Sequence, residues 1–451
     1  LEVIKRERNL EYKGKNVEVV PDIPLEVIRR IETAAEKAQA DITLVEIGGT
    51  IGEYQNIIFL EAARMMKQKV PNDVAVVMVS YVPIPGSIGE MKTKPTQYAS
   101  RSLNSVGLQA DVILARAPLP LDAKRKEKIA VFCNIPSERV ISAPDVKNIY
   151  DIPINFEKDG LGTILTKALG LPEKKTRLGT WKKFVQKFQN GTSTIDIAIV
   201  GKYFDSGDFV LSDVYISVIE AIKFSAAKLG RHAKITWVNS KNLESGGKKE
   251  IAKLAKFQGI IVPGGFGESG VEGKIKAIQF AREKKIPYFG LCYGMQLMVI
   301  EYARNVLKLK DANTTEIKKS CADPVVDVML EQKKHLADNK YGGTMRLGAY
   351  PCYLKKGTLA RAAYKKELVE ERHRHRYEIN PAYIKKLEDA GLVFSGTSPD
   401  GVLMEIAELP RDKHPFMLGT QFHPEFQARP LSPHPLFTAF LSAAISRKRK
   451  K

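Results

Sequence analysis

The chain has 451 residues, with 71 Lys and Arg against 51 Asp and Glu, 44% hydrophobic residues and a formal net charge of +20. This length predicts two or three domains, and the ordinary composition excludes a disordered, collagen-like or coiled-coil chain. No apolar run spans a bilayer, no signal-peptide pattern opens the chain, and the four cysteines form no CxxC pair or disulfide framework. We therefore expect a cytoplasmic protein.

The positive charge does not predict dedicated nucleic-acid binding. Five of the charges lie in the last five residues, 447–451, and the others are scattered among Asp and Glu without a basic stripe that alternates with aromatics. Phosphate neutralisation dominates nucleic-acid affinity, but small polyanions such as nucleotides explain a basic surface equally well.

The first half alternates short β-branched runs with longer helical patterns, which is typical of a parallel α/β sheet. Buried strands are expected over Ile42–Ile47, Val74–Val82 and Asp111–Ala115. Helices are expected over Asn56–Lys69 and Lys124–Asn134.

The pattern weakens near residues 168–191, where polar and Gly/Ser-rich stretches are typical of an exposed connection. We expect a first domain over 1–170, a linker over 171–193, a second domain over 194–445 and a basic tail over 446–451. The alternation of strands and helices resumes in the second domain at Ile195–Val200, Ser212–Leu229, Ile235–Val238, Gly259–Val262, Lys274–Lys284 and Met295–Val306.

The sharpest motif of the second half is a cysteine between two glycines. Gly290, Cys292 and Gly294 follow an apolar strand and precede a helix. Small neighbours permit a strained turn that exposes a nucleophile at the edge of the sheet, and the start of the helix favours the thiolate. A buried structural cysteine is the alternative reading of this motif alone.

Two further motifs favour the nucleophile. A β run ends in His423-Pro424-Glu425, which supplies a general base and a carboxylate that orients it. The glycine-rich turn at 262–267 can point backbone N–H groups into a pocket, where they form an oxyanion hole with the N–H of Tyr293; an ordinary turn is the alternative.

The first half carries two weaker motifs. Glu46 ends a predicted strand and precedes glycines, an arrangement that suits Mg²⁺ beside phosphates. Two lysines and two threonines then offer cations and hydroxyls to a triphosphate, unless they form only an exposed basic loop; the run is Lys92, Thr93, Lys94, Pro95, Thr96, Gln97.

In this order, the three second-half motifs resemble a class I (triad) glutamine amidotransferase. More narrowly, the segments 10–15, 92–97, 312–316, 344–348 and 371–378 are similar to CTP synthase. The resemblance implies an α/β chain with two doubly wound parallel-sheet domains. The first is a P-loop/Rossmann-like synthetase part and the second a flavodoxin-like class I amidotransferase.

The resemblance also implies roles for individual residues of the second half. Cys292 attacks glutamine, His423 transfers protons and Glu425 orients it, while Gly265 and Tyr293 stabilise the oxyanion. Glu316 receives the ammonium group of glutamine and Arg376 its carboxylate. Further glutamine contacts are Gly294, Met295 and Gln296. His373, Arg374 and His375 brace that loop or are solvated charges.

In the first half, the resemblance implies that ATP phosphorylates UTP and that ammonia displaces the phosphate. It also implies that Mg²⁺ is the metal and that GTP is an allosteric activator. The UTP or CTP site comprises residues 92–97, Lys128 and the turn residues Glu53, Tyr54, Gln55. Asp145 and Val146 contact ATP, and Glu46 binds the metal. A homotetramer and filaments are also implied.

The sequence departs from the family pattern in three places. It contains no P-loop, so we expect that this chain alone does not make CTP. Gln55 is neutral where an acidic residue is common, which puts inhibition by CTP in doubt. The segment 267–270 lacks the usual Arg, which predicts weak activation by GTP. Alternatives are another triad amidotransferase and a non-catalytic assembly or filament subunit.

Overall fold

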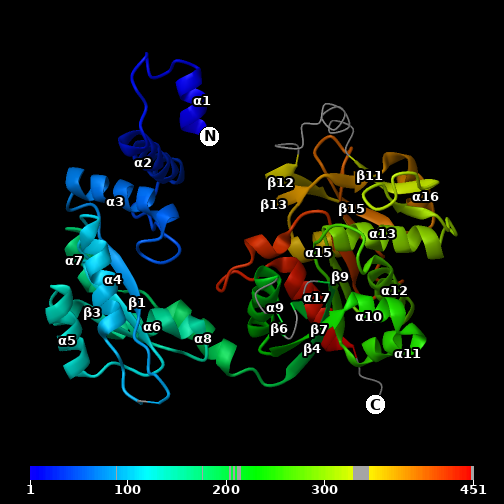
Figure 1. Cartoon of the computed structure of the whole chain (residues 1–451). Helices are drawn as coiled ribbons and strands as arrows, with labels where there is room; N and C mark the ends of the chain where they lie inside the picture. The colour runs from blue at the N-terminus through cyan, green and yellow to red at the C-terminus, as the bar shows by residue number, and fades with distance from the viewer. Residues whose placement is uncertain are drawn as a thin grey trace. The chain divides into compact units, whose positions relative to one another are not determined.

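The computed structural model describes residues 1–87, 89–174, 176–202, 205–206, 209–210, 215–328 and 345–447. Contacts divide the chain into two compact units, Leu1–Leu178 and Gly179–Lys451, and each is described by itself (Figure 1). Three parts of the expected features lie outside the described residues: Thr344, the start of the helix Ser212–Leu229, and the tail beyond Arg447.

The first unit is built on a parallel sheet in the order β1-β2-β3, formed by β1 (Val77–Tyr81), β2 (Val112–Ala117) and β3 (Val140–Pro144). Parallel neighbours need a crossover connection, and two helices supply it, α4 (Lys94–Ser105) and α5 (Ala123–Cys133). The other helices are α1 (Glu2–Arg8), α2 (Val19–Ala38), α3 (Ile57–Lys69), α6 (Ile152–Lys158) and α7 (Leu161–Ala168).

Local sequence explains how α4 and α5 begin. Pro95 lies in the first turn of α4, where its missing N–H costs no helical hydrogen bond. The side chain of Asp122 caps α5 by accepting a 2.8 Å hydrogen bond from the backbone N–H of Arg125. Thr96, Ser100 and Leu103 recur at helical spacing and form the buried face of α4.

Four of the five elements expected in the first half are confirmed, as β1, β2, α3 and α5. The strand expected over Ile42–Ile47 is wrong. This segment has no regular structure, and the side chain of Leu44 is 93% exposed. Apolar character alone does not make a strand, because its backbone groups also need a partner strand, and no described strand pairs with this segment.

The second unit contains a nine-stranded sheet in the order β13-β12-β15-β16-β17-β9-β8-β4-β7. The strands β17, β9, β8, β4 and β7 are parallel, while β16, β15, β12 and β13 extend the sheet in antiparallel fashion. The doubly wound sheet expected from the sequence is therefore mixed. The strands are β4 (Thr194–Gly201), β7 (His232–Asn239), β8 (Gly259–Val262), β9 (Tyr288–Leu291), β12 (Arg346–Leu354), β13 (Leu368–His375), β15 (Val393–Thr397), β16 (Met404–Glu408) and β17 (Met417–Thr420).

Two small sheets complete the strands of this unit. One has the order β10-β11-β14, and the other pairs β5 with β6. Their bounds are β5 (Asp205–Ser206), β6 (Phe209–Val210), β10 (Ala312–Thr314), β11 (Asp323–Val328) and β14 (Tyr377–Ile379).

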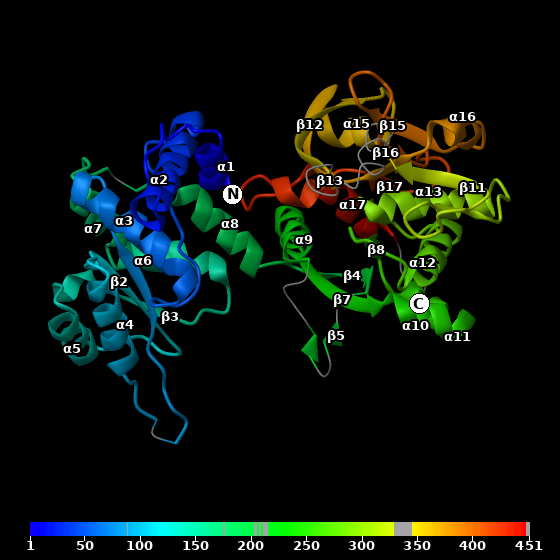
Figure 2. The same ribbon diagram turned by 45° about the horizontal axis from the view of Figure 1, so that its top comes forward.

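Two pairs of helices cover the parallel strands. Figures 1 and 2 both show α9 (Ile216–Lys228) beside α17 (Pro435–Ser446), and α12 (Val271–Glu283) beside α13 (Tyr293–Asn305). Strand side chains alternate between faces, so the buried apolar strands contact both pairs. The remaining helices are α8 (Gly179–Gln189), α10 (Ser240–Ser245), α11 (Gly247–Ala252), α15 (Leu359–Tyr364) and α16 (Pro381–Asp389).

The elements expected over 195–306 are confirmed as β4, α9, β7, β8, α12 and α13, to within a few residues at their ends. The interval 171–193, expected to be a linker, contains α8. The ring of Phe184 on α8 lies 6.2 Å from that of Phe224 on α9. None of the helices in the described part of the chain combines the length and the apolar character needed to cross a membrane.

Candidate active site

The nucleophile candidate lies on a strained turn. Cys292 joins β9 to α13 with φ 49° and ψ −100°. Residues other than glycine rarely adopt this backbone conformation. A Cβ on Gly294 would lie 2.1 Å from the carbonyl oxygen of Val262, and one on Gly290 would lie 2.7 Å from the backbone of Gly294. The two glycines are therefore required by the closeness of the backbones around the turn.

The strand next to β9 ends beside this turn and carries the base candidate. β17 pairs with β9 in parallel, with Thr420 opposite Leu291, and His423 follows three residues later. The Nδ1 atom of His423 lies 2.7 Å from Oε1 of Glu425, and both side chains are buried. Burial alone lowers the pKa of His423, but the charges of Glu425 and Cys292 outweigh it and raise this pKa well above its ordinary value.

The glycine-rich turn after β8 lies against the same imidazole. A Cβ on Gly264 would be 2.8 Å from Cε1 of His423, and one on Gly265 would be 3.8 Å from the ring of Tyr293. The two residues expected to form the oxyanion hole, Gly265 and Tyr293, are therefore neighbours on one side of the triad.

A buried lysine lies behind this turn. Lys274 on α12 is fully buried, its Nζ lies 5.3 Å from the ring centre of Tyr293, and no hydrogen-bond partner of Nζ is found among the described residues. Burial, with a smaller effect from Lys202, lowers the pKa of Lys274 to about 8.

The two residues expected to bind the charged ends of glutamine are also brought together. Glu316 is half-buried and its Oε1 accepts a 2.9 Å hydrogen bond from the backbone N–H of Gly267. Burial raises the pKa of Glu316, while this hydrogen bond and the charges of Lys202 and Arg376 act in the opposite direction. A carboxylate and a guanidinium thus lie close enough to interact, as a zwitterionic amino acid requires.

Met295 and Gln296 point into the protein from the first turn of α13 and are buried. Met295 lies under β17, where a Cβ on Gly419 would approach its Cβ to 2.8 Å. The Nε2 of Gln296 donates to the carbonyl of Tyr377 at 3.0 Å, next to Arg376 in the chain.

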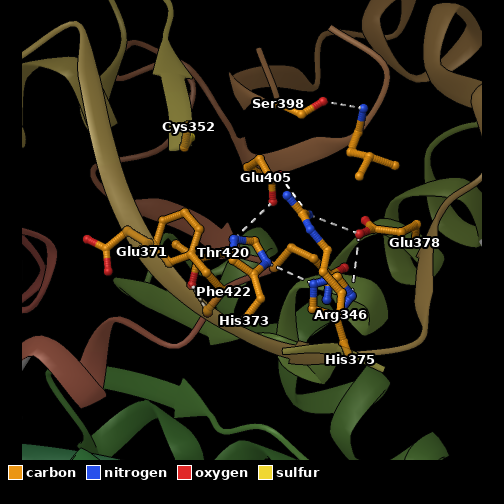
Figure 3. A network of polar contacts seen from close by, with 12 residues as sticks. Arg346, Cys352, Glu371, His373, His375, Glu378, Ser398, Glu405, Thr420 and Phe422 are labelled. Atoms are coloured by element: carbon orange, nitrogen blue, oxygen red, sulfur yellow. Dashed lines mark hydrogen bonds and ion pairs between the residues drawn. The ribbon is translucent and has the colours of Figure 1, made fainter. Parts of the chain in front are cut away.

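A buried ionic network lies behind the loop that carries Arg376. Arg346 Nη1 is 2.8 Å from Glu405 Oε1 and 3.4 Å from Glu378 Oε1, and His373 Nδ1 is 2.8 Å from His375 Nε2 (Figure 3). His373 and His375 are 2% and 5% exposed, so the reading of these two residues as solvated charges is wrong, whereas Arg374 is exposed.

The protonation of this network follows from burial. Burial, with help from the charge of Arg346, lowers the pKa of His373 to about 2 and that of His375 to about 3. Burial also raises the pKa of Glu405 to about 7, against the attraction of Arg346. Neutral histidines therefore lie beside a carboxyl that holds its proton more tightly than usual.

The first unit gathers part of the expected nucleotide site. Lys92 Nζ is 2.8 Å from Glu90 Oε2, and Arg125 is 3.8 Å from the other oxygen of that carboxylate. The hydrogen bond from Lys92 lowers the pKa of Glu90, and the charges of Arg125 and Lys128 lower it further. Lys92 and Lys128, distant in sequence, therefore belong to one cationic cluster.

The other residues of the run 92–97 are divided between exposed and buried positions. Lys94 and Pro95 are exposed at the start of α4, whereas Thr93, Thr96 and Gln97 are buried. Gln97 Nε2 donates to Thr93 Oγ1 at 3.2 Å, and Thr96 Oγ1 accepts from Ser80 Oγ at 2.9 Å. These buried contacts orient the start of the helix.

Three other expected nucleotide contacts lie on separate segments. In the turn before α3, Gln55 donates to Glu53 at 2.7 Å, and Tyr54 is 90% exposed. Asp145 is exposed and pairs with Arg116 at 3.2 Å, and Val146 follows it half-buried. Glu46 lies in the exposed irregular segment, and the described residues contain no group of three or more potential metal ligands.

Sequence reasoning missed four polar residues of the second unit: the buried Lys274, Glu405 and Gln421, and the partly buried Arg346. Each lies in or next to a strand or helix that is otherwise mainly apolar. A polar residue within such an apolar pattern was the signal that could have identified it. The partners of Arg346, Glu405 and Gln421 come from other elements, which no local pattern identifies.

The fold and the cysteine–histidine–glutamate geometry define a triad amidotransferase domain. A family model described as "Glutamine amidotransferase class-I" matches residues 210–443. Another, described as "CTP synthase N-terminus", matches residues 1–171.

Relatives with known names extend this likeness over nearly the whole chain. A CTP synthase of Symbiobacterium thermophilum is 46% identical over 98% of this chain and 81% of the relative, and one of Pyrococcus furiosus is 48% identical over 100% and 81%. The glutaminase domain of Trypanosoma brucei CTPS with bound acivicin is 38% identical, with a TM-score of 0.52, and the match covers 56% of this chain and 95% of that one.

The chain belongs to the CTP synthase family. It combines the family's synthetase domain with a glutamine amidotransferase domain of flavodoxin-like fold. The family consists of glutamine-hydrolysing ligases that use ATP and act in pyrimidine nucleotide biosynthesis.

Proposed function

We propose that this chain hydrolyses glutamine at Cys292, His423 and Glu425, and that, when a P-loop segment is supplied, the ammonia aminates UTP to CTP at the expense of ATP. The observation that carries the proposal is the strained Cys292 turn beside the buried His423–Glu425 pair. This juxtaposition supplies a nucleophile, a base and an orienting carboxylate in the order that acyl transfer needs.

The proposed hydrolysis has two stages. The Cys292 thiolate attacks the amide carbon of glutamine, and the N–H groups of Gly265 and Tyr293 stabilise the oxyanion. His423 gives its proton to the departing nitrogen, so that ammonia leaves and a thioester remains. His423 then takes a proton from water, which attacks the thioester and releases glutamate. Glu316 binds the ammonium group of glutamine and Arg376 binds its carboxylate. The electrostatic effect of Arg376 on Glu316 supports this assignment, because it means that the two side chains lie close together. Gly294, Met295 and Gln296 shape the floor of this site.

The proposed nucleotide half depends on charge. Lys92, Lys94 and Lys128 attract the triphosphate of UTP, and the buried Thr96 and Gln97 hold the start of α4 in place. Glu53, Tyr54 and Gln55 form the pyrimidine turn, while Asp145 and Val146 contact ATP. Mg²⁺ commonly binds to one or two carboxylates together with phosphate oxygens. Glu46, an exposed carboxylate, would hold a metal that arrives with ATP, and that metal would supply positive charge next to the phosphates.

Three proposals concern the wider setting. The free cysteines Cys133, Cys292, Cys321 and Cys352 are in keeping with the reducing cytoplasm. GTP activates glutamine hydrolysis weakly, because the segment 267–270 offers no Arg. The chain assembles as a homotetramer, which light scattering with and without UTP and ATP tests directly.

The deciding experiment compares the purified chain with Cys292→Ala and with Cys133→Ala, a buried cysteine of the other unit. Ammonia and glutamate are measured after addition of glutamine to the chain alone. CTP is measured after a P-loop segment is also supplied, with either glutamine or ammonium chloride as the nitrogen source. We expect Cys292→Ala to lose glutaminase activity and Cys133→Ala to keep it. Equal release by wild type and Cys292→Ala would contradict the proposal.

A further inference from the structure

An amide donor that the sequence did not reveal lies beside the nucleophile. Nε2 of Gln421 is 3.6 Å from Sγ of Cys292, within the range for a hydrogen bond to sulfur. Gln421 follows β17 directly and is completely buried, and its backbone N–H donates to the carbonyl of Glu405 at 2.8 Å. The backbone of Gln421 is therefore held by the central sheet.

A second glutamine determines which way this amide faces. Gln296 Nε2 donates to the carbonyl oxygen of Tyr377 at 3.0 Å and to Oε1 of Gln421 at 3.2 Å. A backbone carbonyl can only accept, so Gln296 must present its NH₂ group there. The same NH₂ group then requires the oxygen of Gln421, which leaves the nitrogen of Gln421 facing the sulfur.

The backbone carbonyl at the start of this chain of hydrogen bonds is itself held. His375 Nδ1 lies 3.3 Å from the same Tyr377 oxygen, and His375 is neutral because burial lowers its pKa to about 3. The Nδ1–H tautomer is the one that donates to a carbonyl. Two donors therefore meet the Tyr377 oxygen, and the direction of the chain from Tyr377 to Cys292 is determined.

A donor aimed at sulfur favours the charged form of the thiol. A hydrogen bond to an ionised acceptor is stronger than one to a neutral acceptor, so it stabilises the thiolate more than the thiol. Both glutamines are almost inaccessible to water, and hence water does not compete for the donor. The thiolate is the form that attacks carbonyl carbon.

We propose that Gln421 is a further catalytic residue of glutamine hydrolysis, which holds the Cys292 thiolate by a hydrogen bond from Nε2, and that Gln296 is the positioning residue that orients it. The inference rests on the proposed function of the triad. These hydrogen bonds also connect Cys292 to the segment that carries Arg376, the proposed ligand of the glutamine carboxylate. The carbonyl that orients Gln296 belongs to Tyr377, the next residue in the chain.

The test uses the full chain and Gln421→Met, which removes the donor and keeps the approximate length of the side chain. Alkylation of Cys292 by iodoacetamide is followed by peptide mass spectrometry across pH, together with glutaminase kcat and KM. We expect the midpoint of the alkylation profile to rise by about one to two pH units. We expect kcat at pH 7 to fall about 10- to 100-fold and to recover toward wild type at higher pH, with KM changed less than about threefold.

Gln296→Met separates orientation from contact. Gln296→Met should also raise the alkylation midpoint and lower kcat, but by less than Gln421→Met does. The double variant should match Gln421→Met alone, because Gln296 acts only through Gln421. Gln258→Met is the control, since Gln258 also bonds to backbone groups of this unit, at Asp196 and Ala444, but is not part of the site. It should leave the alkylation profile unchanged.

Two results would overturn the inference. One is a folded Gln421→Met protein with an unchanged alkylation midpoint, and the other is a shifted midpoint with kcat unchanged. If Gln421→Met does not fold, Gln421→Glu is used in its place, because it keeps the acceptor for Gln296 and should raise the midpoint further by repulsion. If wild type lacks glutaminase activity, the proposed function fails, while the alkylation profile still tests the Gln421 donor.

Discussion

The two units present their functional residues in opposite ways. In Gly179–Lys451, Cys292, His423 and Glu425 are each at most 9% exposed and follow neighbouring central strands. In Leu1–Leu178, Lys94, Glu46 and Asp145 are exposed on helix starts and irregular segments. Covalent chemistry needs atoms held at fixed distances in a water-poor site, whereas charges that attract a polyphosphate act over longer distances and tolerate exposure. The proposed nucleophile and base are therefore buried, whereas these charged side chains of the proposed nucleotide site are exposed, although its neutral residues Thr93, Thr96 and Gln97 are buried.

The largest effect that this comparison predicts is loss of the base. His423→Ala should lower glutaminase kcat by about 1,000-fold or more, since a catalytic base and nucleophile act as a unit. The exposed His232 on β7 provides the control, and His232→Ala should leave kcat within about twofold of wild type. Steady-state ammonia release measures both. A modest loss in His423→Ala would mean that burial does not mark the catalytic residues.

The next largest effect is on stability at the nucleophile turn. Gly294→Ala places a Cβ 2.1 Å from the carbonyl oxygen of Val262, so the backbones must separate. We expect unfolding free energy to fall by about 3 kcal/mol and glutaminase activity to fall with it. Gly48→Ala in the first unit meets no atom within 4 Å and should change stability by less than about 0.5 kcal/mol. Thermal or denaturant unfolding measures the stability of both variants. Equal losses of unfolding free energy in Gly294→Ala and Gly48→Ala would contradict the prediction.

The buried Lys274 predicts a gain in stability. Burial lowers its pKa from 10.5 to about 8, so between these pH values the unfolded chain binds a proton that the folded chain does not. Stability from this group therefore falls as pH decreases from 10.5 to 8 and stays low below it. Lys274→Met should raise unfolding free energy at pH 7 by about 1–3 kcal/mol and flatten the pH dependence above 8. Melting curves at pH 7 and pH 9.5 test this, and a destabilised variant at both would contradict it.

A smaller effect is expected at the cationic cluster of the first unit. Lys92→Ala removes one of the charges around Glu90, so the apparent KM for UTP should rise about tenfold, equivalent to about 1.4 kcal/mol. Glutamine hydrolysis without nucleotides should not change. Kinetics of CTP formation with a P-loop segment supplied give the KM for UTP, and ammonia release by the chain alone gives the rate of glutamine hydrolysis. An unchanged KM for UTP would remove Lys92 from the nucleotide site.

The smallest effect should come from the exposed apolar segment. Leu44 is 93% exposed, so Leu44→Ser should change unfolding free energy by less than about 0.5 kcal/mol. Leu297 on α13 is completely buried, and Leu297→Ala should cost about 2–5 kcal/mol. If denaturant titrations give similar losses for both, another strand or molecule covers the segment in solution.

Sequence patterns predicted the elements of the second unit because its central strands are apolar on both faces and its helices have clear periods. They also identified Cys292, since two glycines around a cysteine have a local cause in the tight turn. The antiparallel strand β13 escaped prediction because most of its residues are charged or histidine, and two of these histidines, together with Arg346 at the start of β12, find buried partners only in the folded sheet.

Two other features could not be read from local sequence. The segment 42–47 has the apolar character of a strand but lacks a partner among the described strands, so composition alone gave the wrong answer. Gln421 lies two residues before His423, yet the role proposed for it depends on a hydrogen bond with Gln296, which is far away in the chain. A single sequence indicates which residues are unusual, but not which of them meet.

The placement of β17 beside β9 also governs when the enzyme becomes active during its synthesis. Gln421 and Cys292 are separated by 129 positions, and β17, which pairs with β9, is the last strand of the sheet in chain order. Such non-local pairing is slow to form, because a long loop closes before its contacts form. On a ribosome that adds about 5–20 residues per second, the cysteine therefore emerges many seconds before its base. A nascent chain therefore lacks the proposed base throughout that interval, and we expect it to release no ammonia until β17 pairs with β9.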